Sequence, residues 1–268
     1  MSDHPSGQER QLKLRLYQAY LDAQDTTPFA GRFMGYNWCS LPNPISAQWM
    51  PYSSMLDEFA RELANTINTL TNRVHRLQSW AKVVETLTDD EKMEATHEFI
   101  DAIATNAVTM PYVVKSRFAF AAAHLCHQAN KAKNPDTWRD DFPLTDAIYL
   151  NTTDKFGQDW NGYNRFKRRV EAISGKAFKN ATGDFRNAYN HRFSPRFVIG
   201  MSDLVTRQVN DATGGIVYAF GGRQPLEVKL VADLLASECE RCYLSFEALQ
   251  ALVREHVEAI IAFDTAQV

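Results

Sequence analysis

Apolar residues recur at helical spacing along most of this 268-residue chain, and this periodicity limits the folds that are open to it. The longest such segments span about 53–86 and 225–263, each several times the length of a strand in a globular protein. A helix with one apolar stripe buries that stripe against other helices. We therefore predict an all-α fold, a helical bundle. Shorter segments with the same periodicity lie at about 11–23, 89–108, 111–133, 161–173 and 183–192.

Residues that favour helix starts mark the ends of these segments. Ser53 and Ser54 can accept hydrogen bonds from the first turn of a long helix, and Thr88 with Glu91 forms a capping-box pattern for the next one. Pro111 suits the first turn of a further helix, because its fixed φ fits there and its missing N–H needs no helical partner. We expect one helix to begin at each of these three points.

Two segments interrupt the helical pattern. The segment 26–52 is rich in Pro, Gly and aromatic residues, and because a solvated linker rarely carries so many large apolar rings, we expect this aromatic loop to pack against the protein body. Short alternating segments at 203–209 and 215–220, joined by turn-forming residues, predict a β-hairpin. With no internal repeat in the sequence, we predict a single helical domain over 1–268 with this hairpin as a small insertion.

Composition excludes several classes of protein. No run of about 18 apolar residues occurs, so we predict no membrane span, and the polar first seven residues do not form a secretory signal. Four cysteines in a chain of this length do not make a disulfide scaffold. We therefore expect a cytoplasmic globular protein.

Positive charge is concentrated near the middle of a chain whose net charge is −3. Residues 161–196 hold nine Lys and Arg against two Asp and Glu, a net charge of +7, which leaves 20 basic and 30 acidic residues elsewhere, a net charge of −10. This basic island can attract a polyanion such as RNA, or it can be a solvated helix face. Six of its cations are candidate RNA-binding residues: Arg165, Lys167, Arg168, Arg169, Arg192 and Arg196.

Within the island, three residues of the segment 186–191 combine groups suited to phosphoryl chemistry. Arg186 is permanently charged and can hold a phosphate, and His191 can exchange protons near neutral pH. Asn187 lies four residues before His191, so on a helix the two side chains share a face and can hydrogen-bond. A phosphate-binding cation beside a proton carrier is the minimum equipment for cleaving a phosphodiester without a metal ion.

Arg186, Asn187 and His191 on a predicted helix of an all-α chain resemble the Arg-polar-x3-His signature of the HEPN superfamily. Members are helical-bundle proteins, and many are ribonucleases in toxin–antitoxin, phage-defence and RNA-processing systems. The resemblance covers about 181–195. It implies an endoribonuclease without a metal or other cofactor, in which the ribose 2′-hydroxyl attacks the adjacent phosphorus. The implied catalytic roles are proton transfer by His191, charge stabilisation by Arg186, and orientation of His191 or the phosphate by Asn187.

The resemblance also implies partners. HEPN enzymes usually act as homodimers in which two motifs face one cleft, and an antitoxin or another defence-system component is a further expected partner. The spacing agrees with a shared site, because five residues turn a helix by about 140° and Arg186 and His191 therefore point in different directions. The chain departs from the family at Phe193, two residues after His191. At this position some HEPN toxins carry a Tyr that a partner enzyme modifies.

Other interpretations stay open at this point. The chain can be a non-catalytic HEPN-like module that binds a nucleotide, RNA or a protein, or a helical interaction protein in which the motif is accidental. A zinc site made of His124, His127, Cys239 and Cys242 would need two separate helices to meet, and the CxxC at 239–242 lacks a second pair. We expect these side chains to be core residues, so no metal site is predicted.

Overall fold

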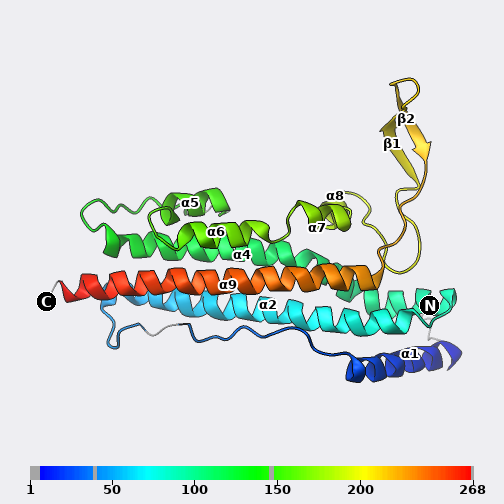
Figure 1. Ribbon diagram of the computed structural model, residues 1–268, viewed down its shortest axis with the longest axis horizontal. Coiled ribbons are helices and arrows are strands. Elements are labelled where there is room, and N and C mark those ends of the chain that lie inside the picture. The colour runs from blue at the N-terminus through cyan, green and yellow to red at the C-terminus, as the bar shows by residue number, and fades with distance from the viewer. Residues whose placement is uncertain (1–6, 39–40, 145–147, 267–268) are drawn as a thin grey trace, which may run out of the picture. The chain divides into compact units, whose positions relative to one another are not determined.

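The structure, a computed structural model, describes residues 7–38, 41–144 and 148–266 (Figure 1). In these ranges the regular structure consists of helices and one two-stranded antiparallel sheet, which confirms the predicted all-α fold with a small hairpin. No helix in the described ranges combines the length and the apolar character that a membrane crossing requires. The helical elements are α1 (Gly7–Thr26), the 3-10 turn η1 (Ala47–Trp49), α2 (Met50–Val84), α3 (Asp89–Ala95), the π-helical turn η2 (Thr96–Ile100), α4 (Asp101–Lys133), α5 (Leu150–Gly157), α6 (Tyr163–Ala172), α7 (Lys176–Ala181), α8 (Phe185–His191) and α9 (Val228–Thr265).

The chain divides into two compact units, each assembled from three stretches of sequence. Unit 1 consists of Met1–Gly31, Asn72–Thr109 and Lys176–Ser237. Unit 2 consists of Arg32–Thr71, Met110–Gly175 and Glu238–Val268. The chain passes from one unit to the other within α2, α4 and α9, so neither unit is a contiguous segment. The single domain over 1–268 stays a prediction.

In unit 1, α1 packs on the end of α2 and on η2 through aromatic rings. Tyr20 of α1 stacks on Trp80 of α2, with ring centroids 4.8 Å apart, and Trp80 stacks on Phe99 of η2 at 5.2 Å. Lys13 of α1 donates a hydrogen bond to Glu98 of η2 at 2.6 Å. The apolar stripe of α1 is therefore matched by rings from two other elements.

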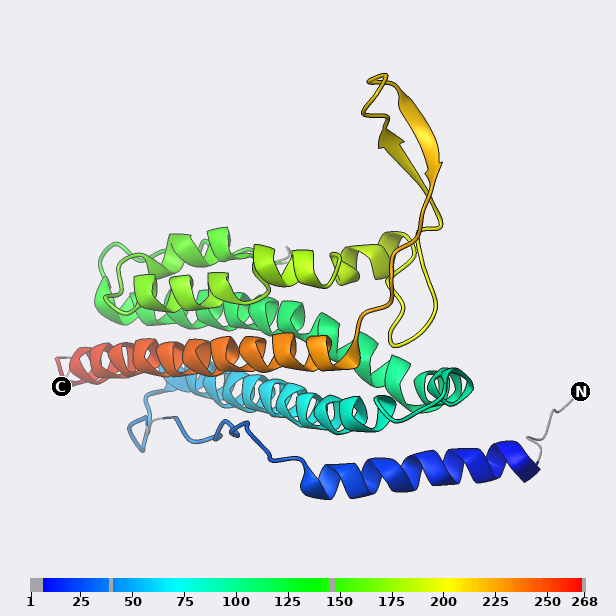
Figure 2. The same cartoon turned by 45° about the vertical axis from the view of Figure 1, so that its right-hand side comes forward.

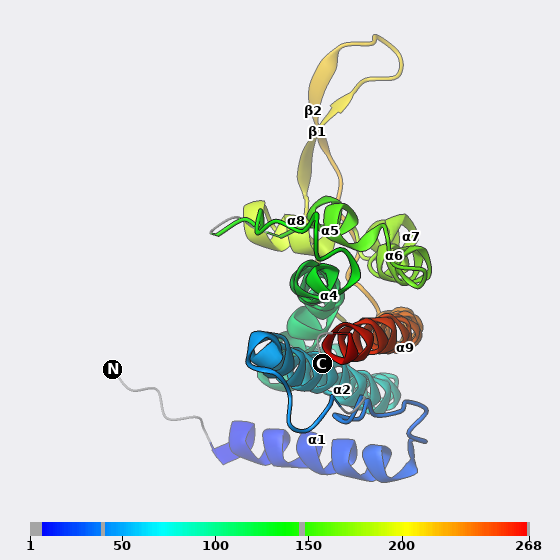
Figure 3. The ribbon, with the colours of Figure 1, turned by 90° about the vertical axis from the view of Figure 1, so that its left-hand side faces the viewer.

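In unit 2, the second half of α4 packs against α6 and against the segment that precedes α6. Phe118 of α4 meets Phe166 of α6 edge to face at 6.2 Å. Asn130 of α4 accepts a hydrogen bond from the Trp160 indole N–H at 2.8 Å. The Thr153 hydroxyl of α5 donates to the Ala119 carbonyl of α4 at 3.0 Å. Figure 3 shows α5 and α6 beside α4, in agreement with these contacts.

His256 of α9 is completely buried in unit 2. Its Nδ1 lies 3.0 Å from the hydroxyl oxygen of Tyr52 on α2, and its Nε2 lies 3.6 Å from Cys126 Sγ on α4. The Trp160 ring meets it edge to face at 4.4 Å. Burial, with a smaller effect from the charge of Lys133, lowers the pKa of His256 to about 3. The imidazole is therefore a neutral core group that joins three elements of unit 2.

The predicted helix starts are confirmed at one of three points. Thr88 and Glu91 form the capping box, in which the Glu91 carboxylate accepts a hydrogen bond from the Thr88 N–H at 2.9 Å. The prediction for Ser53 and Ser54 is wrong, because α2 begins at Met50 and both serines lie inside it. The prediction for Pro111 is also wrong, because this residue lies inside α4. A proline there removes one backbone hydrogen bond, and the residue is buried in unit 2.

The helix predicted over 161–173 is α6, and a residue other than glycine takes a left-handed φ soon after its end. Ser174 takes a left-handed φ of 51° directly after this helix, and its N–H donates to the buried carboxylate of Glu238 at 2.8 Å. This hydrogen bond holds the serine in a conformation that glycine adopts more readily. The sequence pattern predicts no helix over α5 or α7, because each is too short to show a repeated apolar period.

The aromatic loop 26–52 packs down in part. Trp49 is buried and donates its indole N–H to Asp264 at 3.0 Å, and Trp38 meets Phe246 edge to face at 4.8 Å, all within unit 2. Tyr52 at the end of the loop is also buried, whereas three earlier rings are exposed, so the expectation holds mainly for its second half. The exposed rings are Phe29, Phe33 and Tyr36, and Cys39 and Ser40 lie outside the described residues.

The predicted hairpin is present as β1 (Val205–Val209) and β2 (Ile216–Phe220), which pair antiparallel. The views agree that it extends away from α7 and α8 of the same unit (Figure 2). Every residue of the two strands except Ala219 is exposed. An isolated two-stranded ribbon gains little stability by itself, so this element is unusual in leaving its apolar side chains in water.

Candidate functional site

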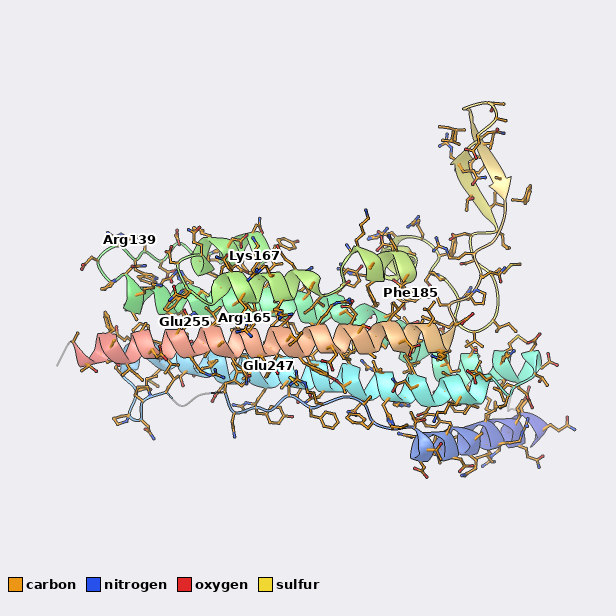
Figure 4. The ribbon with its side chains drawn as sticks, viewed as in Figure 1. Arg139, Arg165, Lys167, Phe185, Glu247 and Glu255 are labelled. Atoms are coloured by element: carbon orange, nitrogen blue, oxygen red, sulfur yellow. The ribbon has the colours of Figure 1, made fainter. Side chains whose placement is uncertain are left out.

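The helix α8 (Phe185–His191) carries the motif, as predicted. Phe185 and Ala188, three residues apart, form its buried face, and Phe185 packs against Phe197 with ring centroids 5.2 Å apart. Figure 4 labels Phe185 at the start of this helix. Anchoring of this one face turns the remaining side chains outward. The exposed residues of α8 are Arg186, Asn187, Tyr189, Asn190 and His191.

The backbone at both ends of α8 leaves the regular helical region. Asp184 precedes it with a left-handed φ of 49°, and Gly183 before that has a φ of 65°. At the other end Arg192 has a φ of −146°, and its N–H donates to the Ala188 carbonyl at 2.8 Å. His191 is therefore the last helical residue, and its side chain lies where the chain turns away.

The motif side chains are exposed, and one predicted contact is not made. In the described part of the chain, neither the Asn187 nor the His191 side chain has a hydrogen-bond partner. The interaction between such a pair on an open helix surface is weak, about 0.2–0.5 kcal/mol, so water competes with it. The prediction that Asn187 orients His191 therefore needs a bound substrate or a second chain to bring the two together.

The six candidate RNA-binding cations are divided between the two units. Arg192 and Arg196 follow α8 in unit 1 and are exposed. Lys167 is partly buried and donates to Asp154 at 2.8 Å, and this hydrogen bond raises its pKa. Because a carboxylate already neutralises it, Lys167 has less charge to offer a polyanion than its neighbours. These four cations lie on α6 in unit 2: Arg165, Lys167, Arg168 and Arg169, of which Figure 4 labels the first two.

One further cation lies beside the turn that starts α8. Arg223, which follows the hairpin, donates its Nη1–H to the Gly183 carbonyl at 3.3 Å, and its Nε lies 3.5 Å from Asp203 Oδ2. It therefore connects the base of the hairpin to the turn before the motif helix. No local spacing pattern signals this contact, because the two residues meet only in the folded chain.

Two aromatic rings on and after α8 are also open to solvent. Tyr189 is 54% exposed and stacks on Phe185 at 5.9 Å, and Phe193 is 81% exposed. Exposed rings beside arginines suit the stacking of unpaired bases. The alternation of aromatic and basic residues over 186–193 is visible in the sequence, and it is the signal that could have identified these rings.

Metal ligation has no support in the described ranges. No group of three or more His, Cys, Asp and Glu side chains there is placed so that it could hold a metal ion. Cys239 and Cys242 are buried in α9, and His127 Nε2 lies 3.1 Å from Asp140 Oδ1. The His124 ring lies 4.2 Å from that of Phe142, so the two cysteines are core residues and both histidines pack against other side chains, as expected.

Comparisons with known proteins assign no relative to this chain. No family model matches it, and neither a curated protein nor a solved structure matches it. The resemblance to HEPN proteins consequently rests on the α8 motif and on the helical fold that carries it.

Proposed function

We propose that this chain is a HEPN-type endoribonuclease that cleaves RNA without a metal ion, in the cytoplasm and within a toxin–antitoxin or phage-defence system. One observation supports this function above the others: Arg186, Asn187 and His191 are all exposed on α8, and the next residue adds a further exposed cation. RNA is a large polyanion, so groups that cleave it must be reachable from solvent. A motif packed into the core would not suit this substrate.

The proposed reaction uses these side chains in separate roles. His191 accepts the proton of the ribose 2′-hydroxyl, whose oxygen attacks the adjacent phosphorus while the bond to the 5′-oxygen breaks. The products are a 2′,3′-cyclic phosphate and a 5′-hydroxyl end. Arg186 stabilises the charge that develops on the phosphoryl oxygens, and Tyr189 and Phe193 stack on neighbouring bases.

The proposal includes a homodimer. The 5′-oxygen must receive a proton as it leaves, and one imidazole cannot accept and donate a proton in the same step. A second copy of the motif supplies the second imidazole, and it also accounts for the different directions of Arg186 and His191 on the helix. An antitoxin or another defence-system protein is the proposed regulatory partner.

Cleavage of RNA in the presence of a chelator tests this function. We expect His191→Ala to reduce the cleavage rate by about 10²–10⁴-fold and Arg186→Ala by about 10²–10³-fold. Asn190→Ala is the matched control, because Asn190 is exposed on the same helix and has no proposed role. Equal cleavage by all variants would point to a contaminating nuclease, and no cleavage by the wild-type chain would reject the catalytic proposal.

One observation favours a second candidate, a non-catalytic HEPN-like module that binds a nucleotide, RNA or a protein. The Asn187 and His191 side chains have no partner in the described residues, whereas catalytic groups are usually held by neighbouring hydrogen bonds. RNA binding that weakens steeply with salt but is not followed by cleavage would support this candidate.

A further inference from the structure

The two outer edges of the hairpin differ in their chemistry. In the described residues no third strand adjoins β1 or β2, and the register between them has no bulge. β2 contains no charged residue and no proline, and Ile216, Tyr218 and Phe220 are 64%, 73% and 91% exposed. Proteins usually protect an open strand edge with a charge, a proline or a bulge, because its backbone groups bind other strands. β2 has none of these protections.

The hydrogen bonds at the base of the hairpin show which backbone groups face outward. The Gly221 N–H donates to the Leu204 carbonyl at 2.9 Å, so these two residues form a hydrogen-bonded pair. Bonded and non-bonded pairs alternate along an antiparallel ladder. The N–H and C=O groups that point away from β1 therefore belong to Ile216, Tyr218 and Phe220.

The alternation of bonded and non-bonded pairs also shows which of the two strands can pair with a second copy of itself. By that alternation Arg207 is the central outward residue of β1, and a second β1 centred on it would place two guanidinium groups opposite each other, which is destabilising. Antiparallel pairing of β2 centred on Tyr218 instead opposes Tyr218 with its own copy and Ile216 with Phe220. This arrangement brings no charges together, and aromatic and β-branched side chains form favourable cross-strand pairs.

We infer that β2 is a self-association edge, which pairs antiparallel with β2 of a second copy about a two-fold axis at Tyr218. Three outward N–H groups on each copy can then donate, which gives up to six hydrogen bonds between the copies. The product is a four-stranded sheet in the order β1-β2-β2-β1. This inference goes beyond the proposed ribonuclease activity, because it assigns the contact surface and is tested without RNA.

The length of the strand sets the strength of this contact. Five residues extend over about 17 Å, so the contact is smaller than the roughly 1,200 Å² of a standard stable interface. The dimer should therefore form in the micromolar concentration range, which sedimentation velocity of the full chain from about 1 to 200 µM can follow.

Charge placed at the two-fold axis tests the register. Tyr218→Lys opposes two like charges and should weaken dimerisation at least tenfold, and Tyr218→Glu alone should do the same. An equimolar mixture of the two variants opposes unlike charges and should restore association. Thr206→Lys is the matched control, because it adds the same charge to the exposed neighbouring strand β1 and should leave the dissociation constant unchanged. Far-ultraviolet circular dichroism of each variant checks that the helices are intact.

Each other result overturns the inference in a recognisable way. A wild-type chain that stays monomeric at 200 µM has no such edge contact, even if it binds a different protein through β2. A dimer unaffected by Tyr218→Lys uses another surface. A mixture of the Lys and Glu variants that stays monomeric shows that position 218 does not face its own copy. None of these results depends on whether the chain cleaves RNA.

Discussion

Acidification from pH 7 to pH 5 should destabilise this protein through His256. In the folded chain this side chain is completely buried, bonded to Tyr52 and close to Cys126, and burial lowers its pKa to about 3. In the unfolded chain a histidine has a pKa of about 6.5. The unfolded state therefore takes up a proton over a pH range in which the folded state does not.

The sign and size of the effect follow from this difference. The folded pKa lies below the unfolded one, so the stabilisation from a neutral His256 is complete above about pH 6.5 and is lost as the pH falls towards 3. Between pH 7 and pH 5 the linkage relation gives a loss of about 2 kcal/mol, and by pH 3 the loss reaches about 4 kcal/mol. The first value alone is a large part of a typical unfolding free energy of about 5–15 kcal/mol.

Urea unfolding at pH 7, 6 and 5 measures the effect, with His256→Gln as the control. Glutamine can still hydrogen-bond to Tyr52 but does not titrate in this range. His124 and His127 are also partly buried, and burial lowers the pKa of both. Their effect on the unfolding free energy is the same in the wild type and in the variant, so it cancels when the two proteins are compared. The difference in unfolding free energy between wild type and variant should shrink by about 2 kcal/mol from pH 7 to pH 5.

A difference that stays constant between pH 7 and pH 5 would refute the argument that His256 is held neutral by burial. If the variant does not fold, nuclear magnetic resonance of the wild-type chain gives a second test. The ring signals of His256 should not titrate above about pH 4, and a titration midpoint near 6.5 would contradict the burial argument.

Three further predictions concern other parts of the chain. Thr88→Ala removes the side-chain half of the capping box and should lower the unfolding free energy by about 1 kcal/mol in urea titrations. Gly183→Ala should lower the unfolding free energy by roughly 0.5–1 kcal/mol more than Gly214→Ala does, again in urea titrations. Both glycines have φ near +65°, but only at Gly183 does the added methyl group lie 2.6 Å from Arg223 Nη1, so that Arg223 must give up its hydrogen bond to the Gly183 carbonyl. Burial raises the thiol pKa of three cysteines, and that of Cys239 reaches about 12. After treatment with a thiol reagent at pH 8, mass spectrometry should therefore find these thiols unlabelled in the native protein and labelled in guanidinium. These thiols are Cys126, Cys239 and Cys242.

Local patterns predicted much of the helical organisation. The capping box at Thr88 and the motif helix α8 depend on neighbours three or four residues apart, so the sequence alone was enough to place them. The hairpin also follows from local alternation and a turn. The helical position of the CxxC at 239–242 was predicted from the periodicity of its surroundings.

The local patterns misplaced one proline and missed two contacts between residues that are distant in sequence. Pro111 is a buried residue inside α4, although a proline also suits the first turn of a helix. Ser174 adopts a left-handed φ because the carboxylate of Glu238, far along the chain, accepts its N–H. Arg223 donates to the carbonyl of Gly183, 40 residues earlier in the chain, at the turn before α8. None of these partners is a neighbour in sequence, so no local rule can identify them.

The division of each unit into three stretches of chain has a consequence for how a gene of this kind can change. A truncation after residue 175 would remove the third stretch of both units, and no single cut separates one unit from the other. Recombination at one breakpoint therefore cannot transfer unit 1 or unit 2 without also carrying part of the other unit. We expect such a gene to be inherited in one piece and to vary by point substitution and by short insertions at exposed tips such as the hairpin loop.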